Sequence, residues 1–210
     1  MKIPSLAIRL LLTAAAAIGL TGCLAFLKPS AVNTRHFVLT PLPAGQAAGP
    51  TSETLAVGVG FVKLPAYLFN RAVAMRQGEN EITYRENEVW AERLDHGLQR
   101  ILAANLASLL PTDRVRLSTW QPTDVAVEVY VTVEQFDVDH TGRGVLVAWW
   151  RVRSPGGETA LRAGEFRADR LGPVPSTDPQ GAVATLSELV AGLSREIAAA
   201  IRTGSPQTAK

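Results

Sequence analysis

The chain has 210 residues with one cysteine, 21 Lys and Arg against 19 Asp and Glu, and a hydrophobic content of 47%. The two basic residues in surplus match Lys2 and Arg9, which precede residue 23, so the rest of the chain is formally neutral. The basic character of the full sequence therefore argues for neither nucleic-acid binding nor a polybasic membrane patch, and a single cysteine excludes an intramolecular disulfide. The length suits one domain with a sizeable packed core.

The amino terminus has the pattern of a secretory signal. Two cations lead into an apolar run over residues 10–20. That run is shorter than the roughly 20 apolar residues that span a bilayer, but it fits the core of a signal peptide. It ends in leucine, two small residues and Cys23, an order that resembles the bacterial lipobox.

The lipobox resemblance implies that the thiol of Cys23 is diacylated and that its amino group receives a third chain, with palmitate among the acyl groups. Several acyl chains anchor a protein stably, whereas one chain binds only marginally. We therefore expect a lipoprotein signal peptide at residues 1–22 and a lipidated tether at residues 23–33. The alternative for Cys23 is an unmodified thiol.

The first half of the folded part reads mainly as strands. Residues 35–42 predict a strand that ends at prolines, and residues 55–62 alternate large apolar with small side chains. That alternation predicts a strand with one packed face, and the small residues indicate that a helix or another backbone lies close over the other. Gly58 and Gly60 do not form a dinucleotide fingerprint, because a third glycine is missing and the pair lies inside the strand.

A loop or edge segment with aromatic side chains follows at residues 63–71, and residues 72–76 and 81–85 predict a hairpin. Next comes an amphipathic helix over residues 88–110, whose apolar residues recur at steps of three and four and which Pro111 ends. Its stripe is read as core rather than as a cofactor site.

The second half predicts a strand at residues 115–120 and then a meander of strands at residues 125–139, 145–153 and 158–169. In the longest of these the buried parity switches after Gln135, which predicts a β-bulge near residues 134–136.

A second amphipathic helix starts at Asp178 and Pro179, as N-cap and first position, and ends at Gly204. These elements predict an α+β fold: one domain at residues 34–204 with a mostly antiparallel mixed sheet and two amphipathic helices packed on one face. Residues 205–210 are expected to be a disordered tail.

No catalytic, metal or cofactor motif stands out. The three histidines are far apart, and no nucleophile elbow or zinc-protease motif occurs. Glu128 and Glu134 are read as members of a solvated strand face rather than as a carboxylate pair. We therefore expect no enzyme, no cofactor and no metal, although a hydrolase with a site assembled from distant residues stays open.

Three stretches, residues 57–68, 85–94 and 105–110, resemble the PqiC family of ABC-type transport auxiliary lipoproteins. The pairing of Leu-Pro-Ala-Tyr-Leu with Trp-Ala-Glu carries most of that resemblance. The chain departs from the family pattern at residues 69–71, where Phe-Asn-Arg replaces Asp-Arg-Pro, and at Arg93, which stands in place of proline. Partner specificity is expected to differ if these positions contact a partner.

The resemblance implies a non-enzymatic lipoprotein on the periplasmic face of the outer membrane. It would work with an MCE-domain periplasmic protein and an inner-membrane permease in lipid transport that supports membrane integrity. Leu24 after the modified cysteine is compatible with outer-membrane sorting. The candidate partner-contact residues are Tyr67, Leu68, Phe69 and Trp90, although a role as core satellites stays open for this segment. A homo-oligomer also stays open, and the alternative function is a scaffold or activator of another envelope machine such as a cell-wall synthase.

Overall fold

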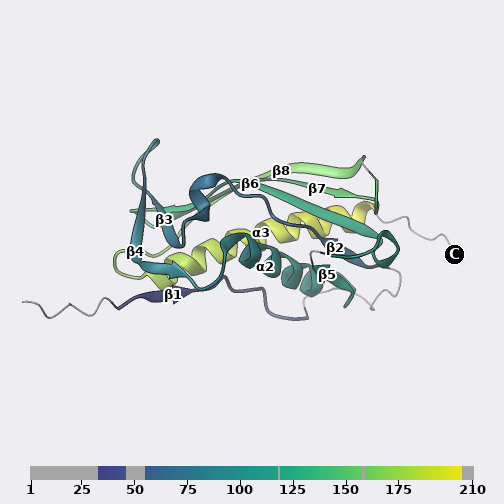
Figure 1. Ribbon diagram of the computed structural model, residues 1–210, viewed down its shortest axis with the longest axis horizontal. Helices are drawn as coiled ribbons and strands as arrows, with labels where there is room; N and C mark the ends of the chain where they lie inside the picture. The colour runs from purple at the N-terminus through teal and green to yellow at the C-terminus, as the bar shows by residue number, and fades with distance from the viewer. Residues whose placement is uncertain (1–32, 46–54, 118, 158, 205–210) are drawn as a thin grey trace, which may run out of the picture. The chain divides into compact units, whose positions relative to one another are not determined.

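The computed structural model describes residues 33–45, 55–117, 119–157 and 159–204 (Figure 1). Residues Thr34–Lys210 form one compact unit, separate from Met1–Asn33. The predicted signal peptide, Cys23 and the carboxy-terminal tail therefore lie outside the described residues. Among the described helices, none has both the length and the hydropathy that crossing a membrane requires.

The described elements are eight strands, two α-helices and two short 3-10 turns. The strands are β1 (Arg35–Phe37), β2 (Val57–Val59), β3 (Ala72–Arg76), β4 (Ile82–Trp90), β5 (Val115–Leu117), β6 (Val127–Asp139), β7 (Arg143–Arg153) and β8 (Ala160–Leu171). The helices are α2 (Leu94–Leu109) and α3 (Pro179–Gly204), and the turns are η2 (Ala66–Phe69) and η3 (Pro122–Asp124).

All eight strands form one sheet built around β6. One edge of β6 pairs with β7, which pairs with β8. The other edge pairs with β2 near the start of β6 and with β3 near its end. Strand β5 then joins β2, while β4 and β1 extend the sheet from β3. The long strand β6 is therefore the central strand of the sheet, with partners on both of its edges.

The predicted α+β class and single domain are confirmed, but the sheet is more mixed than expected. The meander β6–β7–β8 and the hairpin β3–β4 are antiparallel as predicted. The short strands β1, β2 and β5 pair in parallel, and so does β3 with β6. Parallel pairs join strands that are distant along the chain and leave no turn signal between them, so the sequence pattern did not reveal them.

The first helix begins later than predicted. Residues 88–90 belong to β4, because Glu88 and Trp90 pair with β1 at Arg35 and Phe37. The backbone of Trp90 also donates a hydrogen bond of 2.8 Å to the carbonyl of Arg71. Pairing with a distant strand thus overrides a helical apolar spacing. The second helix has the predicted start and end.

The core lies between the sheet and the two helices, which Figure 1 shows on the same side of the sheet. Helix α3 contacts β6, β7 and β8, and α2 contacts α3, β2 and β5. Completely or almost completely buried side chains of both layers meet there, among them Ile101, Leu106, Phe136, Leu146 and Ile197. The predicted role of both apolar stripes as core is confirmed.

The predicted bulge is present, because the register of β6 against β7 shifts between Val133 and Gln135. Before the shift Val129, Val131 and Val133 are buried, and after it Phe136 and Val138 are buried.

The face of β6, β7 and β8 that points away from the helices is called the outer face below. It carries Glu128, Tyr130, Thr132 and Asp137 of β6 and their neighbours on β7 and β8.

Two glycines of the β2 region are required by close neighbours on this outer face. A Cβ atom on Gly58 would lie 2.6 Å from the ring of Trp120, and one on Gly60 would lie 2.6 Å from the ring of Tyr130. The predicted close approach is therefore present, but it comes from aromatic side chains and not from a helix or another backbone.

Candidate functional site

Three of the four predicted partner-contact residues meet at one cleft, where η2 approaches the junction of β4 and α2. The cleft has a volume of about 360 Å³. We call it the β4–α2 cleft, and its lining residues are Leu68, Phe69, Asn70, Arg71, Trp90, Ala91, Glu92, Arg93, Leu94 and Asp95. Residues that are distant in the sequence are thus brought to one place.

The cleft has an apolar floor and an exposed aromatic residue. Leu68, Trp90 and Leu94 are 3%, 5% and 6% exposed, so they form its buried part. Phe69 is 58% exposed. A backbone hydrogen bond joins the two sides of the cleft, since the N–H of Trp90 donates to the carbonyl of Arg71. Phe69 can therefore contact a partner directly, while Leu68 and Trp90 set the shape of the surface.

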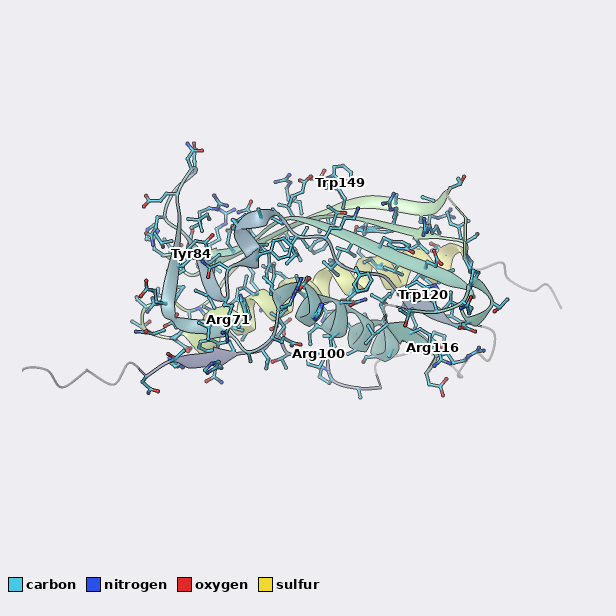
Figure 2. All side chains as sticks on the ribbon, viewed as in Figure 1. Arg71, Tyr84, Arg100, Arg116, Trp120 and Trp149 are labelled. Atoms are coloured by element: carbon cyan, nitrogen blue, oxygen red, sulfur yellow. The ribbon has the colours of Figure 1, made fainter. Side chains whose placement is uncertain are left out.

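The rim of the cleft carries paired charges. Arg93 contacts Asp95 at 2.7 Å, and Arg100 contacts Glu92 at 2.5 Å. The hydrogen bond from Arg93 lowers the pKa of Asp95 below its ordinary value, so this carboxylate is ionised at neutral pH. With Arg71, which is exposed and labelled with Arg100 in Figure 2, these groups sum to one positive charge.

Tyr67, the fourth candidate, points to the outer face of β6 instead. Its hydroxyl lies 3.0 Å from Oδ2 of Asp137, and it accepts a hydrogen bond of 3.1 Å from the backbone N–H of Phe136, next to the bulge. The carbonyl of Tyr67 accepts a hydrogen bond of 2.9 Å from the hydroxyl of Tyr84. Tyr67 therefore fastens the turn η2 to the sheet.

Asp137 is the centre of this arrangement and is 1% exposed. Arg76 donates to both of its oxygens, at 3.2 and 2.8 Å. Gln135 donates to Oδ1 at 3.0 Å. We call Tyr67, Arg76, Gln135 and Asp137 the Asp137 cluster. The buried carboxylate of Asp137 is bound by the guanidinium of Arg76 and by two further donors, Gln135 and Tyr67. The cluster is therefore well suited to stabilise the contact between η2, β3 and β6.

The Tyr67 hydroxyl gives the cluster a pH dependence. Burial, with the negative charge of Asp137, raises the pKa of Tyr67 to about 12 although its bond from Phe136 acts in the opposite direction. An unfolded tyrosine has a pKa of about 10. The stability that Tyr67 contributes is therefore complete below about pH 10 and is lost as the pH rises through the folded value.

We expect Tyr67→Phe to reduce the alkaline loss of stability, because phenylalanine has no proton to release. Urea unfolding at a series of pH values above neutrality measures this. An unchanged slope of the free energy of unfolding against pH in the variant would contradict the assignment.

A second outer-face cluster, which sequence reasoning missed, surrounds Glu128. Its Oε1 accepts from Trp120 at 3.0 Å, and its Oε2 accepts from Arg153 at 2.8 Å and Tyr130 at 3.2 Å. Burial acts to raise the pKa of Glu128, but these hydrogen bonds outweigh it and the pKa lies below its ordinary value.

The prediction that Glu128 lies on a solvated face is therefore wrong: it is 5% exposed, whereas Glu134 is exposed. The guanidinium of Arg153 also lies over the ring of Tyr130, 4.2 Å from its centroid. The only signal in the sequence was the small size of Gly58 and Gly60, which was read as the close approach of a helix or another backbone rather than of the rings of Trp120 and Tyr130. Among the described residues, no group of three or more His, Cys, Asp or Glu is placed to hold a metal ion.

Comparison with known proteins agrees with this fold. The crystal structure of an uncharacterised protein matches with a TM-score of 0.66 and 24% identity, over 80% of this chain and 99% of that one. A crystal structure from Xanthomonas campestris matches with a TM-score of 0.69 and 12% identity, over 83% of this chain and 98% of that one. Both likenesses concern the fold.

Sequence comparison identifies the family. The chain is 26% identical over 142 residues to the intermembrane transport lipoprotein PqiC of Escherichia coli K12, which covers 67% of this chain and 72% of the relative, and equally to PqiC of Shigella flexneri. The family model described as the ABC-type transport auxiliary lipoprotein component matches residues 37–198. That range holds the β4–α2 cleft and both outer-face clusters, and the chain belongs to the family of ABC-type transport auxiliary lipoprotein components.

Proposed function

We propose that this protein is a periplasmic lipoprotein, anchored in the outer membrane through Cys23, that serves as a non-enzymatic auxiliary subunit of an MCE and ABC-type intermembrane lipid transport system. The single observation that carries the proposal is the family match over residues 37–198. It is supported by the PqiC relatives, which are named as intermembrane transport lipoproteins. The lipobox pattern before Cys23 supports the anchor.

The partner surface in this proposal is the β4–α2 cleft. An MCE-domain periplasmic protein would insert an apolar side chain over Leu68, Trp90 and Leu94 and pack against Phe69. Binding energy at protein interfaces is concentrated in aromatic residues beside such desolvated pockets. The permease would lie in the inner membrane and act through the MCE protein. Self-association of the auxiliary subunit stays a prediction.

The Phe69 side chain provides the test. We expect Phe69→Ala to weaken binding of the MCE partner by about 30-fold, the effect of losing roughly 2 kcal/mol at a hot spot. Because Phe69 is 58% exposed, the free energy of unfolding should change by less than about 0.5 kcal/mol. Titration of the purified partner against parent and variant measures the first effect, and urea unfolding measures the second.

A photo-crosslinking residue at position 69 identifies the partner in cells. The control position is 174, an exposed valine in the connection between β8 and α3. A crosslink to an MCE protein from 69 and not from 174 is the expected result. A crosslink from 69 to a cell-wall synthase would instead favour a scaffold or activator of that machine.

A further inference from the structure

A second hollow lies on the outer face of the sheet, away from the β4–α2 cleft. It has a volume of about 380 Å³ and is lined by residues of β6, β7 and β8. These residues are Tyr130, Thr132, Trp149, Trp150, Arg151 and Ala163. We call this hollow, together with the adjoining Lys63, the Trp149 surface. Figure 2 shows Trp149 on the side of the sheet that faces away from the helices.

Trp149 is held in an exposed position. It is 49% exposed, and its Nε1 donates a hydrogen bond of 2.8 Å to Oε1 of Glu134. Its neighbour Trp150 is 7% exposed and donates to Glu196 of α3 on the opposite face. A tryptophan ring contributes most when its large apolar area is buried. Because the Nε1–H of Trp149 already has a partner, the exposed part of its ring is an apolar area that a binding partner could bury.

On the part of the outer face around the Trp149 surface, four cations stand against three anions. Lys63 is paired in the sheet with Thr132, beside Trp149. The outer face here carries Lys63, Arg151, Arg153 and Arg167 against Glu128, Glu134 and Glu165.

Two of the acids are held by cations, Glu128 by Arg153 and Glu165 by Arg167. Glu134 accepts from Trp149. Lys63 and Arg151 are exposed, and within the described ranges neither has a carboxylate at ion-pair distance. Arg151 is the charged member of the hollow, and its guanidinium lies 5.9 Å from the centroid of Tyr130. This surface therefore offers two unpaired cations beside an exposed indole.

We propose that the Trp149 surface binds the bilayer, with the indole at headgroup depth and Arg151 and Lys63 on the phosphates of anionic phospholipids. Tryptophan is enriched at membrane interfaces, and each basic residue near an anionic surface adds to its attraction. Arginine suits phosphate because its fork donates two parallel hydrogen bonds. The inference rests on the proposed function, because the anchor at Cys23 would hold the domain beside a membrane.

The test uses residues 34–210 without any acyl chain, since this compact unit contains the whole described core. Co-sedimentation with phosphatidylcholine vesicles, with and without phosphatidylglycerol, gives the partition constant. We expect binding only to the anionic vesicles. One charge contributes about five-fold, so Arg151→Gln should lose about five-fold and the double variant with Lys63→Gln about 25-fold. Arg195→Gln, an exposed arginine of α3, is the matched control and should lose little.

Two further measurements distinguish a phosphate that belongs to a lipid headgroup from a free phosphate. Brominated lipids should quench the fluorescence of the parent and not that of Trp149→Phe, which places the indole at the bilayer. Equal binding to neutral and anionic vesicles, or equal losses in the Arg151 and Arg195 variants, would overturn the proposal. Displacement from the vesicles by soluble glycerol phosphate would also overturn it, since the site would then belong to a free phosphate. These measurements need neither the MCE partner nor the lipid anchor, so their failure leaves the proposed function standing.

Discussion

Replacement of Asp137 by alanine is expected to lower the free energy of unfolding by about 3 kcal/mol, because it removes one partner of a buried ion pair. Arg76 and Tyr67 would both lose the carboxylate that accepts from them, and only the hydrogen bond from the backbone N–H of Phe136 would still join the Tyr67 hydroxyl to β6. The side chain of Arg76 is 26% exposed, so water can recover part of its solvation and the cost stays at the lower end of the range for buried pairs. Urea unfolding followed by circular dichroism measures the change.

Asp169→Ala is the matched control for this prediction. Asp169 also binds an arginine, Arg143, at 2.9 Å, but both side chains are more than half exposed, at 52% and 55%. Exposed ion pairs contribute at most about 1 kcal/mol. If the two alanine variants lose the same stability, the Asp137 cluster does not hold the turn. A double-mutant cycle with Tyr67→Phe then shows whether the two residues act together.

Loss of the lipid anchor is expected to abolish function while leaving the fold intact. The change exchanges residues 1–23 for a cleavable secretion signal without a lipobox cysteine. Each buried methylene contributes about 0.8 kcal/mol to membrane binding, so an unacylated chain should leave the membrane fraction. The domain then meets its partner only at its bulk concentration and no longer at the higher local concentration beside the bilayer.

Growth under envelope stress of a deletion strain that carries the anchorless variant measures the loss of function. A foreign lipoprotein signal that restores an acylated cysteine is the control and should complement. Full complementation by the unacylated, soluble form would show that the anchor is dispensable and would contradict the proposal.

Local patterns predicted the elements whose causes are local. The parity switch after Gln135 predicted the bulge, and the Asp178 and Pro179 pair predicted the start of α3. Non-local pairing explains the errors. Glu88 and Trp90 lie in a strand because β1, some 50 residues earlier in the chain, pairs with them.

The candidate site shows the same difference between what local sequence predicts and what non-local contacts decide. The sequence resemblance named Leu68, Phe69 and Trp90, and the fold brings them to one cleft. The resemblance could not distinguish the exposed Phe69 from the buried Leu68 and Trp90, because exposure is set by how η2 packs in the folded chain. Tyr67 has the same local pattern as its neighbours, yet its partner Asp137 is 70 residues away.

Intact mass spectrometry of the chain extracted from fractionated membranes would show whether one modified cysteine holds the folded auxiliary domain at a membrane. We expect the amino terminus to be Cys23 carrying three acyl chains and the protein to be found with the outer membrane. An amino terminus without acyl groups, on a chain recovered in the soluble periplasmic fraction, would contradict it.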